Sequence, residues 1–420
     1  MKRADAYIVP ALVLGLTLFI GCGKEEEKKE GPQSFEEFAA EIEVKPEEVA
    51  PRVEEEAVED ERLLIVGAIG PRTGEQAEYG LMTLEGASMA LDSLNASGGI
   101  GGRRVELRTV DNRGSDGGTQ EAMAGLIDEG VMAIIGAPTG WSTFTPVYTA
   151  NDRRTVFISA GTRRHIGRSG PFVFRYSLPG ERAAEGLIEY CVKEEGYKEF
   201  ALVTVMEDEA LNVSSFFRIA IQNAGAAIKT EGHIFADPDI PAAVKELKGK
   251  LPLDAVVFVG SSRSAGLFLS EARKQGVKLP LIGGEELHTE EFLRAGNGVE
   301  GSLVYAGFSP LDETPAVKSF IDSYKRKKKG LPPATFVAEA YDSFMLVADA
   351  VKRAGSTRPG EVMAAMMDTK GFEGITGIAD MDDKGEITRD PYILKVVMKK
   401  NGPAFSLVSA PHHRSVPGAE

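Results

Sequence analysis

After residue 62, short apolar runs alternate along the chain with longer stretches whose apolar side chains recur every three or four positions. Residues 63–69 form a continuously apolar run of strand length, as expected for a strand that is covered on both faces. Residues 81–94 carry apolar side chains at helical spacing, and the glycines at 98–102 predict the end of that helix. Residues 105–110 have the alternating character of a second strand.

The same order repeats through the rest of the chain. Further strand-like runs, separated by helical stretches, occur at 131–135, 155–159, 200–205, 255–259, 279–282 and 303–305. A repeated strand–helix order is typical of an open, mostly parallel sheet with helices on both faces. Because the rhythm restarts around 172–181, and 420 residues suffice for two cores, we expect an α/β fold of two doubly wound parallel-sheet lobes.

The first residues have the pattern of an export signal. A short basic start precedes an apolar run at 6–20, which is too short for an ordinary membrane span. Residues 18–22 resemble a bacterial lipobox, in which the cysteine, here Cys22, carries lipid and becomes the mature N-terminus. The alternative is an ordinary signal peptide with an incidental cysteine. Either way, the sequence predicts a signal peptide at 1–22 and an exported protein.

The net charge of −15 argues against nucleic-acid binding, which needs a basic surface. Most of this charge lies between residues 23 and 62, which hold 16 acidic and 6 basic side chains. Such a segment cannot bury enough apolar surface to offset its ordering entropy, so 23–61 is predicted to be an acidic, disordered tether. The acidity therefore says little about a ligand.

Cysteine usage and the search for motifs favour binding over catalysis. If Cys22 carries lipid, Cys191 has no partner for a disulfide, and its apolar helical surroundings predict a buried small side chain. The acidic run 380–385 places Lys384 where a calcium loop needs a ligand, and the five histidines show no metal spacing. The sequence has no phosphate-binding loop or nucleophile elbow. We therefore expect no enzyme activity, no cofactor and no metal.

Ligands of open α/β sheets bind beyond the carboxyl ends of the strands, so the segments after the predicted strands are candidate ligand loops. These segments are 71–79, 137–143, 160–164, 206–212, 261–264 and 284–288. Family-like motifs lie in and around them: GPRTG at 70–74, NASGGIGGR at 95–103, EARKQG at 271–276, AYD at 340–342, RAGS at 353–356 and DKG at 383–385. In this order, over residues 63–397, they resemble the branched-chain amino-acid binding proteins of ABC importers.

The resemblance implies a type I periplasmic-binding-protein fold, with two lobes joined by a hinge. The expected segments are a first lobe of 62–180 and 307–388 with a helix at 336–354, a second lobe of 181–306 and 389–410, and a loose tail of 411–420. Such proteins clamp the carboxylate of an amino acid with hydroxyl and backbone N–H groups of the first lobe. A carboxylate of the second lobe holds the ammonium group, and hinge closure excludes water and strengthens these contacts.

Three residues match the ligand contacts of that family. Thr162 matches a clamp hydroxyl, Glu285 matches the carboxylate that binds the ammonium group, and Tyr79 matches the aromatic that packs over the ligand. Each also has a plainer interpretation. Thr162 could cap a turn, Glu285 could be a solvated acid in a loop, and Tyr79 could pack only between the lobes.

Other loop positions depart from the family. Gly140 stands where a clamp serine is usual, so Thr139 or Ser142 would have to supply the hydroxyl, while the backbone N–H groups of Gly140 and Trp141 could still hold a carboxylate. Trp141 either stacks on the ligand or packs in the protein. Arg163 either pairs with a second acidic group on the ligand or belongs to a solvated basic turn.

The side-chain pocket also differs, because Glu209 and Ser261 replace residues that are usual in the second lobe. A branched-chain ligand is therefore not assumed. The candidate ligand-binding residues are Tyr79, Thr139, Gly140, Trp141, Ser142, Gly161, Thr162, Arg163, Glu209, Ser261 and Glu285.

Together, the export signal and the resemblance predict a solute-binding lipoprotein that faces the periplasm or the cell exterior. Its expected partners are a small polar ligand, such as an amino acid or a related compound, an ABC transporter permease, and the membrane through a lipid anchor, with no nucleic acid. Two alternatives use the same fold: a ligand sensor, and a structural envelope lipoprotein that has lost ligand binding.

Overall fold

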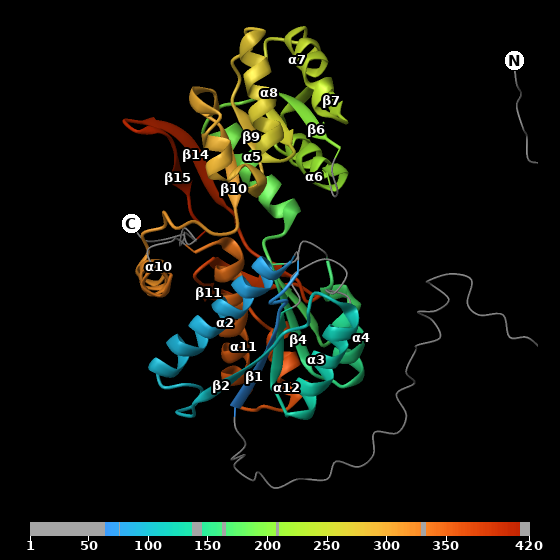
Figure 1. Cartoon of the computed structure of the whole chain (residues 1–420), viewed down its shortest axis with the longest axis vertical. Helices are drawn as coiled ribbons and strands as arrows, with labels where there is room; N and C mark the ends of the chain where they lie inside the picture. Colours follow the sequence, from blue (N-terminus) through green and yellow to red (C-terminus); the bar gives the residue numbers. More distant parts are fainter. Residues whose placement is uncertain are drawn as a thin grey trace, which may run out of the picture. The chain divides into compact units, whose positions relative to one another are not determined.

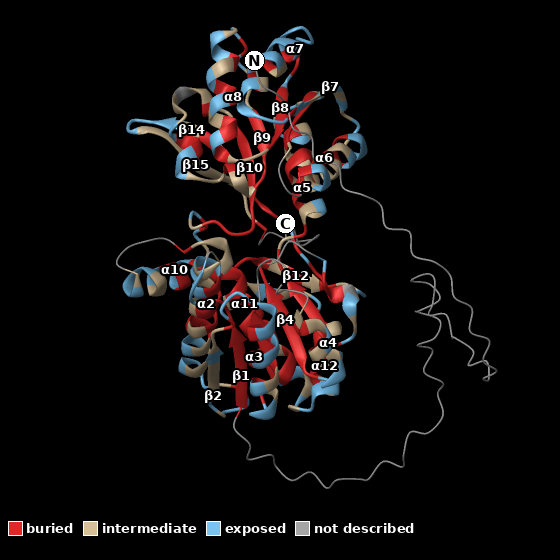
Figure 2. Cartoon of the chain, turned by 45° about the vertical axis from the view of Figure 1, so that its right-hand side comes forward, coloured by how far each residue is buried: buried red, intermediate tan, exposed pale blue. Residues whose placement is uncertain are grey.

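Two β-sheets organise the part of the chain that the structure, a computed structural model, describes: residues 64–74, 76–136, 145–161, 165–206, 210–328 and 333–411. We call the elements around the five-stranded sheet the first lobe and those around the seven-stranded sheet the second lobe (Figure 1). Buried strands lie between helices whose outer faces are exposed (Figure 2). Each lobe therefore has its own apolar core.

The first lobe contains a parallel sheet with the strand order β2-β1-β3-β4-β5. Its strands are β1 (Leu64–Ile69), β2 (Val105–Val110), β3 (Ala133–Gly136), β4 (Val156–Ala160) and β5 (Val173–Tyr176). One face packs against α2 (Ala77–Ala96), α11 (Thr335–Ala354) and α12 (Pro359–Met367). The other face packs against α3 (Asp116–Asp128) and α4 (Thr145–Asp152). This double coverage explains why all six residues of β1 are buried and apolar.

The second lobe contains a sheet with the order β15-β14-β10-β9-β8-β6-β7. Its strands are β6 (Glu199–Val205), β7 (Ala227–Ile234), β8 (Ala255–Val259), β9 (Leu281–Gly283), β10 (Leu303–Ala306), β14 (Tyr392–Lys399) and β15 (Gly402–Ser409). One face packs against α5 (Gly180–Lys193) and α6 (Ala210–Asn223). The other packs against α7 (Ile240–Lys248), α8 (Ser262–Lys274) and α9 (Glu290–Leu293).

Three segments connect the lobes. Residues 177–179 lead from β5 into α5, residues 307–314 lead from β10 into α10 (Pro315–Lys327), and residues 389–391 lead into β14. Helix α10 packs against α2 and α11, so it belongs to the first lobe. A small antiparallel sheet of β11 (Phe372–Gly374), β12 (Gly377–Met381) and β13 (Ile387–Thr388) also contributes to the first-lobe core.

The NASGGIGGR motif has a local structural reason. The Asn95 side chain at the end of α2 accepts a hydrogen bond from Val105 N and donates one to Val105 O, both at 2.9 Å, which fixes the start of β2. Gly99 has φ +74°, and a Cβ there would lie 1.9 Å from Arg103 O, so no larger residue fits the turn. The motif therefore sets the connection between α2 and β2.

The predicted α/β fold with two sheet-based lobes is confirmed, and the predicted helix 336–354 is α11 of the first lobe. The expectation of a parallel second sheet is wrong at one edge, because β14 runs antiparallel to β10 and β15 runs antiparallel to β14. The chain enters β14 directly from the first lobe, without the crossover helix that a parallel strand requires. Cys191 is fully buried, as predicted.

Helices of the described part offer no candidate for a membrane span, since none is both long and apolar enough to cross a bilayer.

Candidate functional site

Four of the candidate ligand-binding residues lie in the described part of the chain: Tyr79, Gly161, Ser261 and Glu285. Outside the described residues lie Thr139, Gly140, Trp141, Ser142, Thr162, Arg163 and Glu209, together with the predicted lipidation site Cys22.

Tyr79 and Gly161 meet at the ring of Phe336. Tyr79, in the first turn of α2, is 41% exposed, and its ring centroid lies 4.9 Å from that of Phe336. Gly161 follows β4 with φ +77°, and a Cβ at this residue would lie 2.3 Å from Phe336 Cδ1. A glycine is therefore required at position 161, because its backbone is left-handed and because the Phe336 ring fills the space that a side chain would need. The structure thus joins two predicted positions through an aromatic of α11 that was not predicted.

Ser261 caps a helix of the second lobe. Its hydroxyl accepts a hydrogen bond from Ser264 N and donates one to Ser264 Oγ. Ser261 therefore provides an acceptor for one of the backbone N–H groups in the first turn of α8. The adjacent Ser262 hydroxyl contacts Glu286 O and Thr289 Oγ1, which ties α8 to the segment after β9. These contacts fix the backbone on which Glu285 lies.

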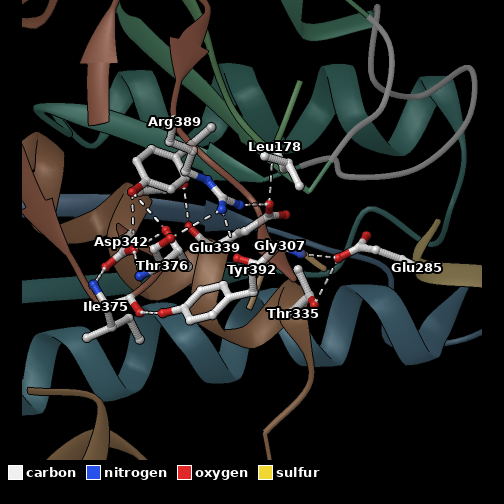
Figure 3. A network of polar contacts seen from close by, with 12 residues as sticks. Leu178, Glu285, Gly307, Thr335, Glu339, Asp342, Ile375, Thr376, Arg389 and Tyr392 are labelled. Carbon is white, nitrogen blue, oxygen red and sulfur yellow. Dashed lines mark hydrogen bonds and ion pairs between the residues drawn. The ribbon is translucent and has the colours of Figure 1, made fainter. Parts of the chain in front are cut away.

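Glu285 reaches from the second lobe to the first (Figure 3). It begins the short helix η4 (Glu285–Leu287) directly after β9 and is half-buried. Its Oε1 accepts hydrogen bonds from Gly307 N, on the segment after β10, and from the Thr335 hydroxyl, 3.3 Å away at the start of α11. Glu285 is therefore held in place by one partner on a connecting segment and one in the first lobe.

A buried ion pair lies beside Glu285 (Figure 3). Arg389 donates from Nη2 to Glu339 Oε1 at 2.6 Å and from Nη1 to Gly307 O at 2.8 Å, and both residues are 3% exposed. Leu178 N donates to the same Glu339 oxygen at 3.1 Å. Burial raises the pKa of Glu339 to about 7, although Arg389 opposes that rise. This pair contacts all three segments that connect the lobes.

A second buried carboxylate lies one turn along α11. Asp342 accepts hydrogen bonds from Ile375 N at 2.9 Å, from Thr376 N at 2.8 Å, from the Thr376 hydroxyl at 2.6 Å and from the Tyr176 hydroxyl at 3.1 Å. Burial raises the pKa of Asp342, and the hydrogen bonds from Thr376 and Ile375, together with the charge of Arg389, oppose the rise. Asp342 thus anchors the turn between β11 and β12 to the core of the first lobe.

His165 forms a third polar cluster with acids of both lobes. Its Nε2 lies 3.3 Å from Glu181 Oε1 of α5, and its Nδ1 lies 3.4 Å from Glu386 Oε2, which also pairs with the buried Arg175. The hydrogen bonds to Glu181 and Glu386 raise the pKa of His165 to about 9, against burial and the charge of Arg175. His165 is therefore protonated at neutral pH and joins the first lobe to the second.

Several residues of the junction were not predicted from the sequence: Gly307, Thr335, Phe336, Glu339 and Arg389. A signal did exist for one of them, because Glu339 and Asp342 are acids inside an otherwise apolar helical stretch. The others become neighbours only through the long connections between lobes. In the described residues, no group of three or more His, Cys, Asp or Glu side chains is arranged to hold a metal ion.

Comparison with known proteins identifies relatives along nearly the whole folded part. A family model described as "Periplasmic binding protein" matches residues 64–403. A "Leucine-, isoleucine-, valine-, threonine-, and alanine-binding protein" of Pseudomonas aeruginosa is 26% identical over 328 residues, which are 77% of this chain and 86% of the relative. A "Leu/Ile/Val-binding protein homolog 3" of Brucella melitensis is also 26% identical, over 77% of this chain and 89% of the relative.

Solved structures are similar over the same region. A branched-chain amino acid transporter substrate binding protein from Streptococcus pneumoniae, in complex with isoleucine, has a TM-score of 0.62 and 26% identity and covers 83% of this chain and 99% of its own. An ABC transporter substrate-binding protein from Sphaerobacter thermophilus has a TM-score of 0.71 at 20% identity and covers 83% and 98%. The second likeness shows the fold alone.

Proposed function

Because the chain belongs to the periplasmic binding protein family, we propose that it is an exported solute-binding lipoprotein that delivers an amino acid or a related small polar compound to an ABC importer. The family match also agrees with the expectation that the protein binds a solute and is not an enzyme. The ligand class is supported by the two relatives at 26% identity whose names specify amino acids.

The observation that carries the proposal is the position of Glu285. Glu285 directly follows a parallel strand of the second lobe and contacts the start of a first-lobe helix. A ligand between the lobes would be bound at this place. Both described donors reach the same oxygen, Oε1. The other oxygen, Oε2, has no donor among the described residues. We assign Oε2 to the ammonium group of the ligand, since charge-assisted hydrogen bonds of this kind are strong.

The remaining candidate residues complete the proposed site. Tyr79 would cover the ligand from the first lobe, with its ring held by Phe336. The first-lobe loops with Thr139, Gly140, Trp141 and Ser142, and the residues Gly161, Thr162 and Arg163, would bind the carboxylate. Glu209 and Ser261 would face the side chain of the ligand from the second lobe.

The test is a thermal-shift screen against the twenty common L-amino acids, each added alone. A ligand at about 1,000 times its dissociation constant stabilises the folded state by about 4 kcal/mol, which gives a clear rise in melting temperature. For the amino acid that binds, Glu285→Gln should weaken binding by roughly 10- to 150-fold, because it removes a charge-assisted hydrogen bond worth about 1.5–3 kcal/mol. Glu291→Gln, an exposed acid on α9, is the matched control and should bind normally.

A screen without any stabilising amino acid would refute a common amino acid as the ligand and leave two options, a related small polar compound or a structural role. Binding that survives Glu285→Gln unchanged would leave the receptor function standing but remove Glu285 from the site.

Membrane anchoring is tested separately. Cys22 is proposed to carry the lipid, so Cys22→Ser should move the protein from the membrane fraction to the soluble fraction and abolish incorporation of labelled fatty acid. An unchanged membrane fraction in the variant would refute lipid anchoring at this residue.

A further inference from the structure

The Glu339–Arg389 ion pair occupies an unusual place in the chain. The lobes are joined by three separate segments; the pair makes hydrogen bonds to two of them and contributes Arg389 to the third. Leu178 of the first segment donates to Glu339, Gly307 of the second accepts from Arg389, and Arg389 itself belongs to the third. Arg389 Nη1 also lies 3.3 Å from Thr376 O of the first lobe. One buried pair therefore ties the complete junction to α11.

Gly307 links this ion pair to Glu285. Its carbonyl accepts from Arg389 and its N–H donates to Glu285, so a single residue carries contacts to both. A Cβ on Gly307 would lie 2.8 Å from Thr335 Cγ2 and 3.1 Å from both Arg389 Nη2 and Glu285 Oε1. The backbone of Gly307 does not need a left-handed conformation, so the requirement for glycine is one of space. Any side chain here would displace a partner of Glu285 or of Arg389.

The hydrogen bonding of Arg389 is also incomplete. Its Nε–H is buried and has no acceptor among the described residues. Buried donors of a purely static ion pair are normally satisfied, because an unpaired one is costly. An Nε–H group without an acceptor in this arrangement of the lobes is what we expect if the contacts of Arg389 change when the hinge moves.

We propose that Glu339 and Arg389 form a hinge clamp, and that Gly307 transmits the state of this clamp to Glu285 and so positions the ligand-binding carboxylate. Arg389 is thus a positioning residue that acts through Gly307 without touching the ligand. The inference rests on the proposed function for the role of Glu285, but the clamp itself is independent of the identity of the ligand.

Two measurements separate the clamp from the ligand assignment. The first is the distance between spin labels at Tyr148→Cys in the first lobe and Phe235→Cys in the second, both highly exposed, in a chain that carries Cys22→Ser. Cys191 is fully buried and stays unlabelled. The second is the affinity for each of the twenty common L-amino acids.

Without ligand, Gly307→Ala and Arg389→Met should shift or broaden the distance distribution, while Gly266→Ala, a glycine of α8 with room for a methyl group, should not. Gly307→Ala should weaken the binding of the responsive amino acid by roughly tenfold. Thr335→Val, which removes one hydrogen bond to Glu285, should also weaken binding, and Thr335→Ser should restore it.

An unchanged distance distribution in folded Arg389→Met or Gly307→Ala would overturn the clamp. If Arg389→Met does not fold, Gly307→Ala decides, because it leaves both charges in place. A changed distribution with unchanged affinity would overturn the transmission to Glu285. If no amino acid binds even the wild-type protein, a common amino acid is ruled out as the ligand, and the distance measurement still tests the clamp.

Discussion

Asp342 offers a sharp test of how the first lobe is held together. Its carboxylate accepts four hydrogen bonds, two of them from the backbone N–H groups of Ile375 and Thr376, and the residue is 1% exposed. In Asp342→Ala the two hydroxyl donors, Tyr176 and Thr376, can still bond each other, since their oxygens are 3.1 Å apart. The N–H groups of Ile375 and Thr376, in contrast, lose the carboxylate that accepts their hydrogen bonds and remain buried.

The expected loss of stability follows from these two groups. A buried donor without a partner costs about 1–3 kcal/mol, so two of them cost about 2–6 kcal/mol. Removing a carboxylate whose burial is itself unfavourable offsets part of this loss, which leaves about 1–5 kcal/mol. Tyr176→Phe removes one donor and leaves Asp342 with three, so it should cost only about 1 kcal/mol.

Urea unfolding of the two variants, followed by circular dichroism, measures this difference in the transition that includes the first lobe. Asp342→Ala should lower the midpoint several times more than Tyr176→Phe. The reasoning is refuted if the two variants lose equal stability, or if Asp342→Ala loses less than about 1 kcal/mol. Since whole proteins are stable by only about 5–15 kcal/mol, the expected loss lies well within the measurable range.

Buried and paired side chains elsewhere in the described part of the chain should respond to pH, to thiol reagents and to substitution. The pKa of His165 is about 9 against 6.5 without partners, so its stabilisation is complete below pH 6.5 and is lost as the pH rises through 9. Between pH 6 and 9.5 the wild type should therefore lose about 1 kcal/mol more stability than His165→Gln, measured by thermal melts; this value is reduced because the side chain is 37% exposed. An equal change in melting temperature with pH for the two proteins would contradict this. Cys191 is fully buried, and burial raises the pKa of its thiol. In Cys22→Ser a thiol reagent should therefore label Cys191 only after unfolding. Rapid labelling of the native protein would contradict this burial. Gly86→Ala should destabilise α2, because its Cβ would lie 2.3 Å from Val337 O. Gly125→Ala in α3 has open space around its Cβ and should stabilise the protein by about 0.5–1 kcal/mol. Stability changes of the same sign for both variants in urea unfolding would refute the packing argument.

Parallel strands and the helices between them could be predicted from the sequence because each has a strong local pattern. Strand β1 is buried on both faces and reads as an uninterrupted apolar run, and α11 carries its apolar residues at helical spacing over twenty residues. The hairpin of β14 and β15 was missed, although Asn401 and Gly402 between two apolar stretches are a turn signal. The direction in which β14 joins the sheet depends on where the chain comes from, which a local pattern does not contain.

Predicting the site was limited for a different reason. Glu285 and Tyr79 could be proposed from motifs next to strands and helices, whereas their partners come from distant parts of the chain. Gly307 looks like any glycine after a strand, and its role depends on contacts with Arg389, 82 positions later. Such neighbours are set by how the three connecting segments meet, so no spacing in the sequence reveals them.

Stability alone does not account for an ion pair at this junction, because buried ion pairs are often no more stabilising than apolar side chains of similar volume. The backbone gives a better reason. Where the chain leaves a sheet, its N–H and C=O groups lose their ladder partners and still need hydrogen bonds. Glu339 accepts from Leu178, and Arg389 donates to Gly307, so two side chains supply those bonds at the points of crossing. An apolar pair could fill the space but would leave these backbone groups unpaired, which is why the junction between the lobes is polar.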